Sequence, residues 1–199
     1  SIKFINLMVM KRFVLFSGLF AVLLGCGSNR QFTEQDNQDY QNLQELVASK
    51  SLEIVSTSAI PMATVAFSKV ANSRILGPGN NASNIDITSN SNKLTIKGDS
   101  IRGYLPYFGE QTFGGGPYGG NHTGIEFNNI PKDYQVVQNG KKHAVDISFK
   151  INDQYRNNDL YTIMITLYPN YRSEIRVQST TRTPIEYMGR VSKLEQDQK

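Results

Sequence analysis

Three side chains of this sequence are of the types that most often bind metals or act as nucleophiles: Cys26, His122 and His143. A catalytic zinc ion needs three protein ligands, and the two histidines belong to separate loop regions rather than one helical face. We therefore expect both histidines to lie in exposed loops. The sequence has no Gly-x-Ser-x-Gly element, and nothing in it argues for a triad of a serine, His143 and Asp146. These observations predict a protein that is not an enzyme and holds no metal or cofactor.

The chemistry that the sequence does favour is lipidation of Cys26, the only cysteine, which ends the element Leu23-Leu-Gly-Cys26. Lipoprotein processing requires a small residue followed by a thiol, because the thiol accepts the lipid and becomes the new N-terminus. Met10-Lys-Arg12, followed by the apolar run Phe13–Leu24, has the layout of a bacterial secretory signal peptide. The sequence predicts that translation starts at Met10, that residues 1–25 are removed, and that acyl chains anchor Cys26.

This leader predicts a location in the cell envelope, lipid-anchored at the outer membrane and facing the periplasm. The chain contains 21 Lys and Arg against 17 Asp and Glu. Three of the cations precede the cysteine, namely Lys3, Lys11 and Arg12, so 18 cations and 17 acids follow and the net charge falls to +1. Nucleic acid as a partner is therefore not expected, because its recognition needs a strongly basic surface. The sequence gives no indication of the oligomeric state.

The second feature is an aromatic stretch, Arg102–Gly109, which is followed by a glycine-rich run as far as Gly124. Glycines allow backbone angles that other residues avoid, and Pro106 implies a strand end or edge. Such a segment either forms the lip of a ligand pocket or plugs one end of a sheet with its aromatic rings. If it is a lip, five residues would line the pocket: Tyr104, Tyr107, Phe108, Phe113 and Tyr118.

One amphipathic helix is expected before the strands. Helix-forming residues begin near Thr33, and the pattern ends near Lys50. Four apolar side chains recur at spacings of three and four residues: Tyr40, Leu43, Leu46 and Val47. The stripe predicts packing on a sheet. Residues 26–39 would then form a lipidated N-terminus and tether that overlaps the start of the helix.

From Ser51 onward, apolar residues alternate with polar ones, which is typical of strands with one buried face. Alternation is clearest at residues 145–151 and 161–167. Asn139-Gly140 suits a two-residue hairpin turn in which both residues have positive φ. The run from Ile60 to Phe67 is expected to continue the first strand.

Strands at intervals of about ten residues, joined by tight turns, predict an antiparallel meander rather than βαβ units. We expect a mainly β fold in which this sheet curls into a half-barrel, a lipocalin-like barrel or a sandwich, with the helix packed on it. Residues 33–191 would form this single β-rich domain, and residues 192–199 a frayed tail.

Three motifs resemble those of a known family: Tyr104-Leu-Pro-Tyr-Phe-Gly109, Gly124-Ile-Glu-Phe127 and Arg182-x-x-Ile-Glu-Tyr-Met-Gly189. They are similar to motifs of Gram-negative envelope lipoproteins catalogued only as a domain of unknown function. The resemblance covers about Gln35 to Val191 and includes the helix. It implies a fold and a location but no mechanism, because that family has no established activity.

Two functions are favoured by the sequence, and a third, a hydrolase, stays open only because a sequence does not show which side chains meet in space. The first is non-catalytic binding of a small apolar or amphipathic ligand at the aromatic lip, since the mouths of β-barrels are common ligand sites. The alternative is an interaction or assembly module that docks exposed aromatic residues on another envelope protein.

Overall fold

The computed structural model describes residues 32–62, 64–72, 77, 79–111, 124–156 and 158–195. The chain divides into two compact units, Ser1–Thr33 and Glu34–Lys199. All the described strands and the whole described hydrophobic core lie in the second unit. This unit therefore contains the packing that it needs to fold by itself. Among the described residues, no helix has both the length and the apolar character needed to cross a membrane.

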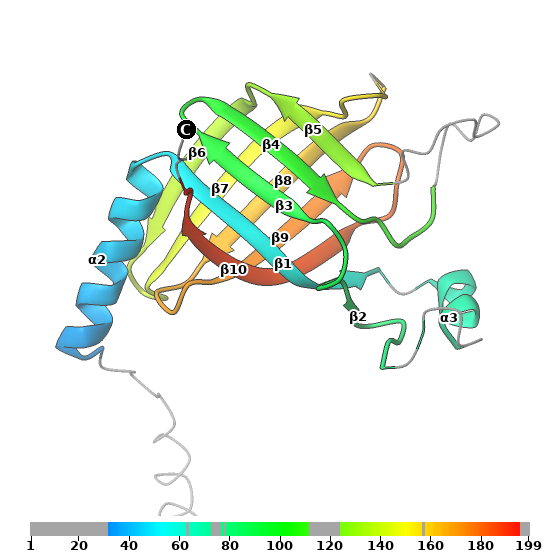
Figure 1. Ribbon diagram of the computed structural model, residues 1–199, viewed down its shortest axis with the longest axis horizontal. Helices are drawn as coiled ribbons and strands as arrows, with labels where there is room; N and C mark the ends of the chain where they lie inside the picture. The colour runs from blue at the N-terminus through cyan, green and yellow to red at the C-terminus, as the bar shows by residue number, and fades with distance from the viewer. Residues whose placement is uncertain are drawn as a thin grey trace, which may run out of the picture. The chain divides into compact units, whose positions relative to one another are not determined.

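The fold is an antiparallel sheet that curls into a half-barrel, which confirms the predicted class (Figure 1). The strands are β1 (Ser51–Pro61), β2 (Ile85–Asp86), β3 (Lys93–Lys97), β4 (Ser100–Leu105), β5 (Ile125–Asn129), β6 (Lys132–Asn139), β7 (Ala144–Asn152), β8 (Leu160–Leu167), β9 (Arg172–Ser179) and β10 (Ile185–Lys193). Their order across the sheet is β5-β4-β3-β1-β10-β9-β8-β7-β6, and β2 pairs with β1.

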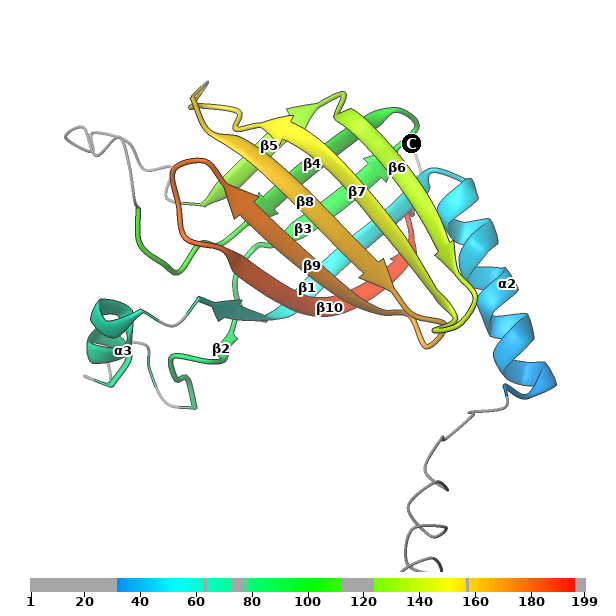
Figure 2. The same ribbon diagram turned by 180° about the vertical axis from the view of Figure 1, so that it is seen from behind.

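The two outermost strands of this order, β5 and β6, follow each other in the chain. The short link Ile130–Pro131 therefore crosses the seam where the curled sheet does not close (Figure 2). Part of the seam is bridged beside β5, where the backbone N–H of Gln154 donates to the carbonyl oxygen of Glu126 at 2.7 Å. Buried aromatic side chains fill the interior, among them Phe127, Phe149 and Tyr161.

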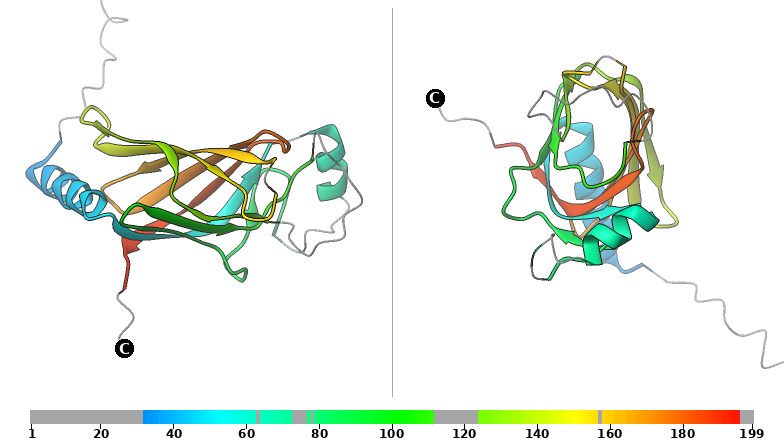
Figure 3. Two further views of the ribbon diagram at one scale, coloured as in Figure 1. Left: turned by 90° about the horizontal axis from the view of Figure 1, so that it is seen from above. Right: turned by 90° about the vertical axis from the view of Figure 1, so that its right-hand side faces the viewer.

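The predicted helix is present as α2 (Glu34–Ala48), and the predicted stripe faces the core. Leu43 and Val47 are buried, and Tyr40 and Leu46 pack against the core from its margin. Viewed along the half-barrel, α2 lies across one of its two openings (Figure 3). The helix therefore closes this end with the same apolar residues that define its periodicity.

A break in the ladder of β1 is filled by a buried side chain. The pairing of β1 with β10 shifts its register between Ser56 and Ser58. On its other side, β1 pairs with β3 before this point and with β2 after it. The Oδ1 atom of Asn92 accepts the backbone N–H of Ser56 at 2.8 Å. The Nδ2 atom of Asn92 donates to the carbonyl oxygens of Ile87 and Asn90, both at 3.0 Å. One asparagine thus satisfies backbone groups that would otherwise be buried without partners.

The prediction that the first strand continues as far as Phe67 is wrong. β1 ends at Pro61, where the backbone N–H of Met62 donates to the carbonyl oxygen of Pro184, and a second helix follows, α3 (Val65–Asn72). The Oγ1 atom of Thr64 accepts the backbone N–H of Phe67 at 3.1 Å, which is the bond of a helix N-cap. This cap favours helix over strand in an apolar run whose periodicity is ambiguous.

The predicted β6–β7 hairpin exists, but its turn differs. Residues 140–143 form the loop, and φ is positive at His143 rather than at Asn139 or Gly140. The Oδ1 atom of Asn139 accepts the backbone N–H of Lys142, which stabilises the longer loop. His143 is only 8% exposed and stacks on Tyr40 with ring centroids 4.8 Å apart, so the expectation of an exposed His143 is wrong. His122 lies outside the described residues.

β10 continues through Lys193, two residues beyond the predicted domain boundary at 191. The backbone N–H of Leu194 still donates to the carbonyl oxygen of Ser51 at 3.1 Å. The pairing of β10 with β1 therefore holds the chain to the sheet past this boundary.

Candidate functional site

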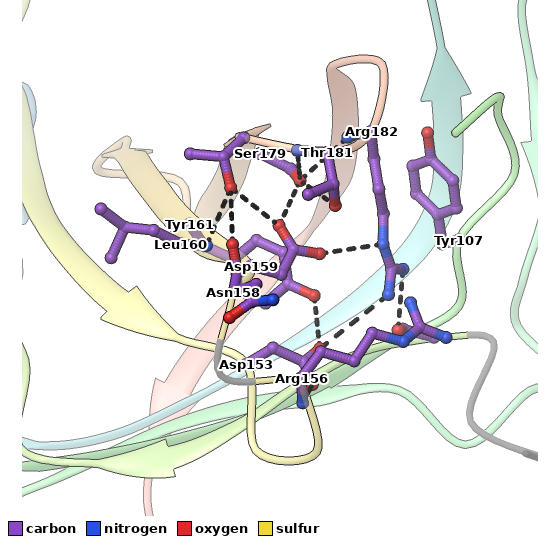
Figure 4. Close-up of polar contacts among 12 residues, drawn as sticks. Tyr107, Asp153, Arg156, Asn158, Asp159, Leu160, Tyr161, Ser179, Thr181 and Arg182 are labelled. Atoms are coloured by element: carbon purple, nitrogen blue, oxygen red, sulfur yellow. Dashed lines mark hydrogen bonds and ion pairs between the residues drawn. The ribbon is translucent and has the colours of Figure 1, made fainter. Parts of the chain in front are cut away.

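The three motif segments meet at the end of the half-barrel that lies away from α2 (Figures 1 and 4). The Nη1 atom of Arg182 donates to the carbonyl oxygen of Gly124 at 2.9 Å. The guanidinium of Arg182 lies over the ring of Tyr107, 5.0 Å from its centroid. The hydroxyl of Tyr187 donates to the carbonyl oxygen of Pro106 at 2.9 Å. Residues far apart in the sequence thus close one end of the fold together.

Arg182 is the centre of a buried group of polar side chains, which we call the Arg182 cluster. Its members are Arg182, Asp153, Asp159, Tyr161 and Ser179 (Figure 4). The Nε atom of Arg182 lies 3.2 Å from Oδ2 of Asp159, and its Nη2 atom lies 3.9 Å from Oδ2 of Asp153. The side chains of these three residues are at most 3% exposed. One cation therefore faces two carboxylates inside the protein.

Both carboxylates of the Arg182 cluster also accept hydrogen bonds. Asp153 Oδ2 accepts the hydroxyl of Tyr161 at 2.5 Å, and Asp153 Oδ1 accepts the backbone N–H groups of Tyr155 and Arg156. Asp159 Oδ1 accepts the hydroxyl of Ser179 at 2.5 Å. Buried charges require partners of this kind, because their desolvation is costly. The cluster consequently ties the β7–β8 loop to the end of β9.

Two buried phenols at this end stay protonated. Burial, together with the hydrogen bond to Asp153, raises the pKa of Tyr161 far above its usual range. Burial also raises the pKa of Tyr187 well above its ordinary value, with a further contribution from Tyr107. Each phenol therefore serves as a hydrogen-bond donor, and neither is available as a base at neutral pH.

The described part of the predicted lip does not gather around one pocket. The hydroxyl of Tyr107 lies 2.9 Å from the carbonyl oxygen of Glu110 and 2.9 Å from Oγ1 of Thr183, and Phe108 packs against the core. Tyr104 is 44% exposed and alternates with the buried residues of β4, so it lies on the convex face of the sheet. The role of these three residues in ligand binding stays a prediction. Cys26, Phe113 and Tyr118 lie outside the described residues.

A second set of bonds holds the segment that follows the aromatic stretch. The backbone N–H of Thr183 donates to the carbonyl oxygen of Glu110 at 2.9 Å, and the carboxylate of Glu110 accepts the hydroxyl of Thr64. A side chain at Gly103 would occupy the place of the Phe127 ring, which explains a glycine in the middle of β4. The aromatic stretch is thus bonded on several sides, as expected of a plug.

Among the described residues, surface hollows lie beside α2. The first, which we call the α2–β6 groove, has a volume of about 600 Å³ and a mostly apolar lining. Its lining residues are Gln44, Val47, Ala48, Lys50, Tyr134, Val136, Val137, Gln138 and Val145. The second, which we call the hairpin groove, has a volume of about 230 Å³. It is lined by Lys50, Ile96, Gly98, Asp99, Ile101, Ile130, Pro131 and Tyr134.

A third groove, of about 660 Å³, separates α2 from β10. Its lining mixes polar and apolar surface and includes three charged residues, Glu45, Arg190 and Lys193. This groove is slightly larger than the α2–β6 groove, but a lining with three charged side chains suits an apolar ligand less well than a lining with one. The α2–β6 groove is therefore the better candidate for ligand binding.

Sequence reasoning missed the residues that build both regions. Asp153 and Asp159 flank a hairpin loop, where aspartate is usually a solvated turn residue. Only the position of Arg182 in space shows that they are buried. Tyr134 and Val136 precede the predicted turn at Asn139-Gly140, but the sequence does not tell which strand forms the open edge. Among the described residues, no group of three or more His, Cys, Asp or Glu side chains could hold a metal ion.

The Arg182 cluster makes a prediction about stability. Arg182→Met would leave two buried carboxylates without their cation, so we expect the free energy of unfolding to fall by about 3–5 kcal/mol in denaturant titrations. Arg176→Met is the matched control, because Arg176 forms an exposed ion pair with Glu186 and should change stability by less than about 1 kcal/mol. Equal effects of the two substitutions would contradict the structural role of Arg182.

Comparison with known proteins identifies the family. A family model described as a domain of unknown function (DUF4251) matches residues 34–191. The chain is also similar to the crystal structure of a DUF4251 family protein from Bacteroides eggerthii. The TM-score is 0.51 at 11% sequence identity, and the match covers 80% of this chain and 92% of that chain. At this identity the likeness shows the fold alone. No curated protein matches the chain. Because the family model spans most of its length, the chain belongs to the DUF4251 family.

Proposed function

We propose that the protein is a non-catalytic binding module of the cell envelope, anchored by a lipid at Cys26 to the outer membrane and facing the periplasm. Its ligand would be a small apolar or amphipathic molecule. The observation that carries this proposal is the α2–β6 groove, whose volume of about 600 Å³ is in the range of small-molecule sites. The anchor rests on the sequence Leu23-Leu-Gly-Cys26 and the leader before it.

The groove exposes residues that belong to the concave face of the sheet. Val136 lies opposite Ile147, which is in the core, so the two side chains share one face. Val136 is nevertheless 42% exposed, because no strand covers the outer side of β6 among the described residues. Tyr134 is half-buried on the same face and stacks on Phe149, with ring centroids 6.3 Å apart. An apolar ligand in the groove would thus extend the core at its open margin.

Protein docking at the same edge is the second candidate function. β6 ends the order of the sheet, and its segment Gln135–Asn139 carries no charged side chain. Charged residues are a common means of protecting an edge strand from pairing with another chain. Val137, on the convex face, is 57% exposed. An extended segment of an envelope protein could therefore pair with β6.

The anchor predicts the behaviour of a lipidation variant. With the full chain expressed in a Gram-negative host, we expect the protein to enter the membrane fraction and to incorporate an alkyne-labelled fatty acid. Cys26→Ser should abolish both, because the serine hydroxyl cannot replace the thiol as lipid acceptor. Ser28→Ala is the control and should change neither. Labelling that persists in Cys26→Ser would contradict the anchor.

The groove predicts binding of a neutral apolar dye. The compact unit Glu34–Lys199 should enhance the fluorescence of N-phenyl-1-naphthylamine, and Val136→Asp should raise the Kd by about tenfold or more, because the ligand would bury a carboxylate. Val55→Asp is the matched control, since Val55 is 40% exposed on the convex face of β1. Circular dichroism would verify that both variants fold. Absence of binding, or equal weakening by both substitutions, would contradict the groove as the site.

A further inference from the structure

Lys50 occupies a fixed position between the two apolar grooves beside α2. It lines both the α2–β6 groove and the hairpin groove, as does Tyr134. Its backbone is left-handed, with φ of 47°, and its N–H donates to the carbonyl oxygen of Val47 at 3.1 Å, which ends the helix. Its carbonyl oxygen accepts the backbone N–H of Gly98 at 2.8 Å. The backbone of Lys50 is therefore held by α2 on one side and by the β3–β4 turn on the other.

Lys50 also supplies the charge of the site. Among the described residues that line the α2–β6 groove, it is the one charged side chain. Its Nζ atom lies 2.7 Å from Oδ1 of Asp99 and 5.8 Å from the centroid of the Tyr134 ring. The hydrogen bond to Asp99 raises the pKa of Lys50 and lowers that of Asp99, so the pair is ionised at neutral pH.

The ion pair between Lys50 and Asp99 is open to exchange. The side chain of Asp99 is 77% exposed and that of Lys50 is 45% exposed. Exposed pairs of this kind contribute little to stability, because water solvates both partners and salt screens them. A carboxylate brought in by a ligand can therefore replace Asp99 at Lys50 without leaving a buried charge.

The walls on both sides of Lys50 suit a hydrocarbon chain. Val47, Val136 and Val145 lie on the side of the α2–β6 groove. Ile96, Ile101 and Ile130 lie on the side of the hairpin groove. A cation held between two apolar surfaces is complementary to a molecule with one anionic end and one apolar chain.

We propose that the ligand is a single-chain amphiphile with a carboxylate head, whose head pairs with Lys50 while its chain lies along Val47, Val136 and Val145. The inference rests on the proposed ligand-binding function and names the class of ligand and the residue that selects it. The negative head distinguishes this ligand from neutral and cationic molecules with the same chain.

The test compares two amphiphiles that share a chain, dodecanoate and dodecyltrimethylammonium, as competitors of N-phenyl-1-naphthylamine on the unit Glu34–Lys199. Both are used below the concentrations at which they form micelles. We expect dodecanoate to bind at least about tenfold more tightly, and Lys50→Gln to remove this preference. Asp99→Asn should have the opposite effect and tighten dodecanoate binding several-fold, because it frees Lys50. Lys93→Gln is the control, since Lys93 pairs with Glu53 on the convex face and should leave the preference intact.

Two other outcomes would contradict the inference, and they differ in what they say about the proposed function. If the dye binds but both amphiphiles compete equally, or if Lys50→Gln retains the preference, the role of Lys50 is wrong while the binding function stands. If neither the dye nor an amphiphile binds to the folded protein, both the inference and the proposed function are wrong. Thermal unfolding of Lys50→Gln and Asp99→Asn verifies that the variants are folded.

Discussion

The buried charge of Arg182 is the constraint on which one end of this half-barrel depends. A guanidinium without access to water must be surrounded by acceptors, and here these come from Asp153, Asp159 and the carbonyl oxygen of Gly124. The ring of Tyr107 covers the cation, and its hydroxyl is bonded in turn to Thr183. Satisfying one charge therefore fixes the loops that end β4, β7 and β9.

The opposite end of the half-barrel is closed by apolar packing and ring stacking rather than by buried charges. α2 contributes buried apolar side chains, Leu43 and Val47, and the stacked pair of Tyr40 and His143 completes the closure. Between a polar cluster at one end and an apolar helix at the other, the seam beside β6 leaves apolar side chains exposed, among them Ile130 and Val136. The proposed ligand site follows from this division, because a ligand there completes an open margin without displacing a packed core.

Much of this architecture could be predicted from the sequence, for reasons visible in particular residues. The alternation at residues 145–151 and 161–167 is unambiguous because one face of β7 and β8 is buried and the other is half-exposed. The helix was predictable because its stripe is long enough to show a period. The short run after Pro61 was not, although Thr64 is a recognisable N-cap.

The candidate sites were less accessible to sequence reasoning. The sequence drew attention to the aromatic stretch, but a half-buried Tyr107 and an exposed Tyr104 look alike in a sequence. The roles of Asp153, Asp159 and Lys50 depend on partners that are distant in the chain. No local sequence pattern indicates such partners. The three motifs, by contrast, marked residues that meet in space, because each supplies a group that contacts another.

The central claim is that ligands bind at the seam beside α2 and that the Arg182 end is structural. Hydrogen–deuterium exchange of the folded protein with and without dodecanoate tests it most directly. The account predicts added protection in β6 and in the C-terminal half of α2, with no change at residues 106–111. Protection confined to residues 106–111 would contradict it and would place the ligand at the aromatic stretch.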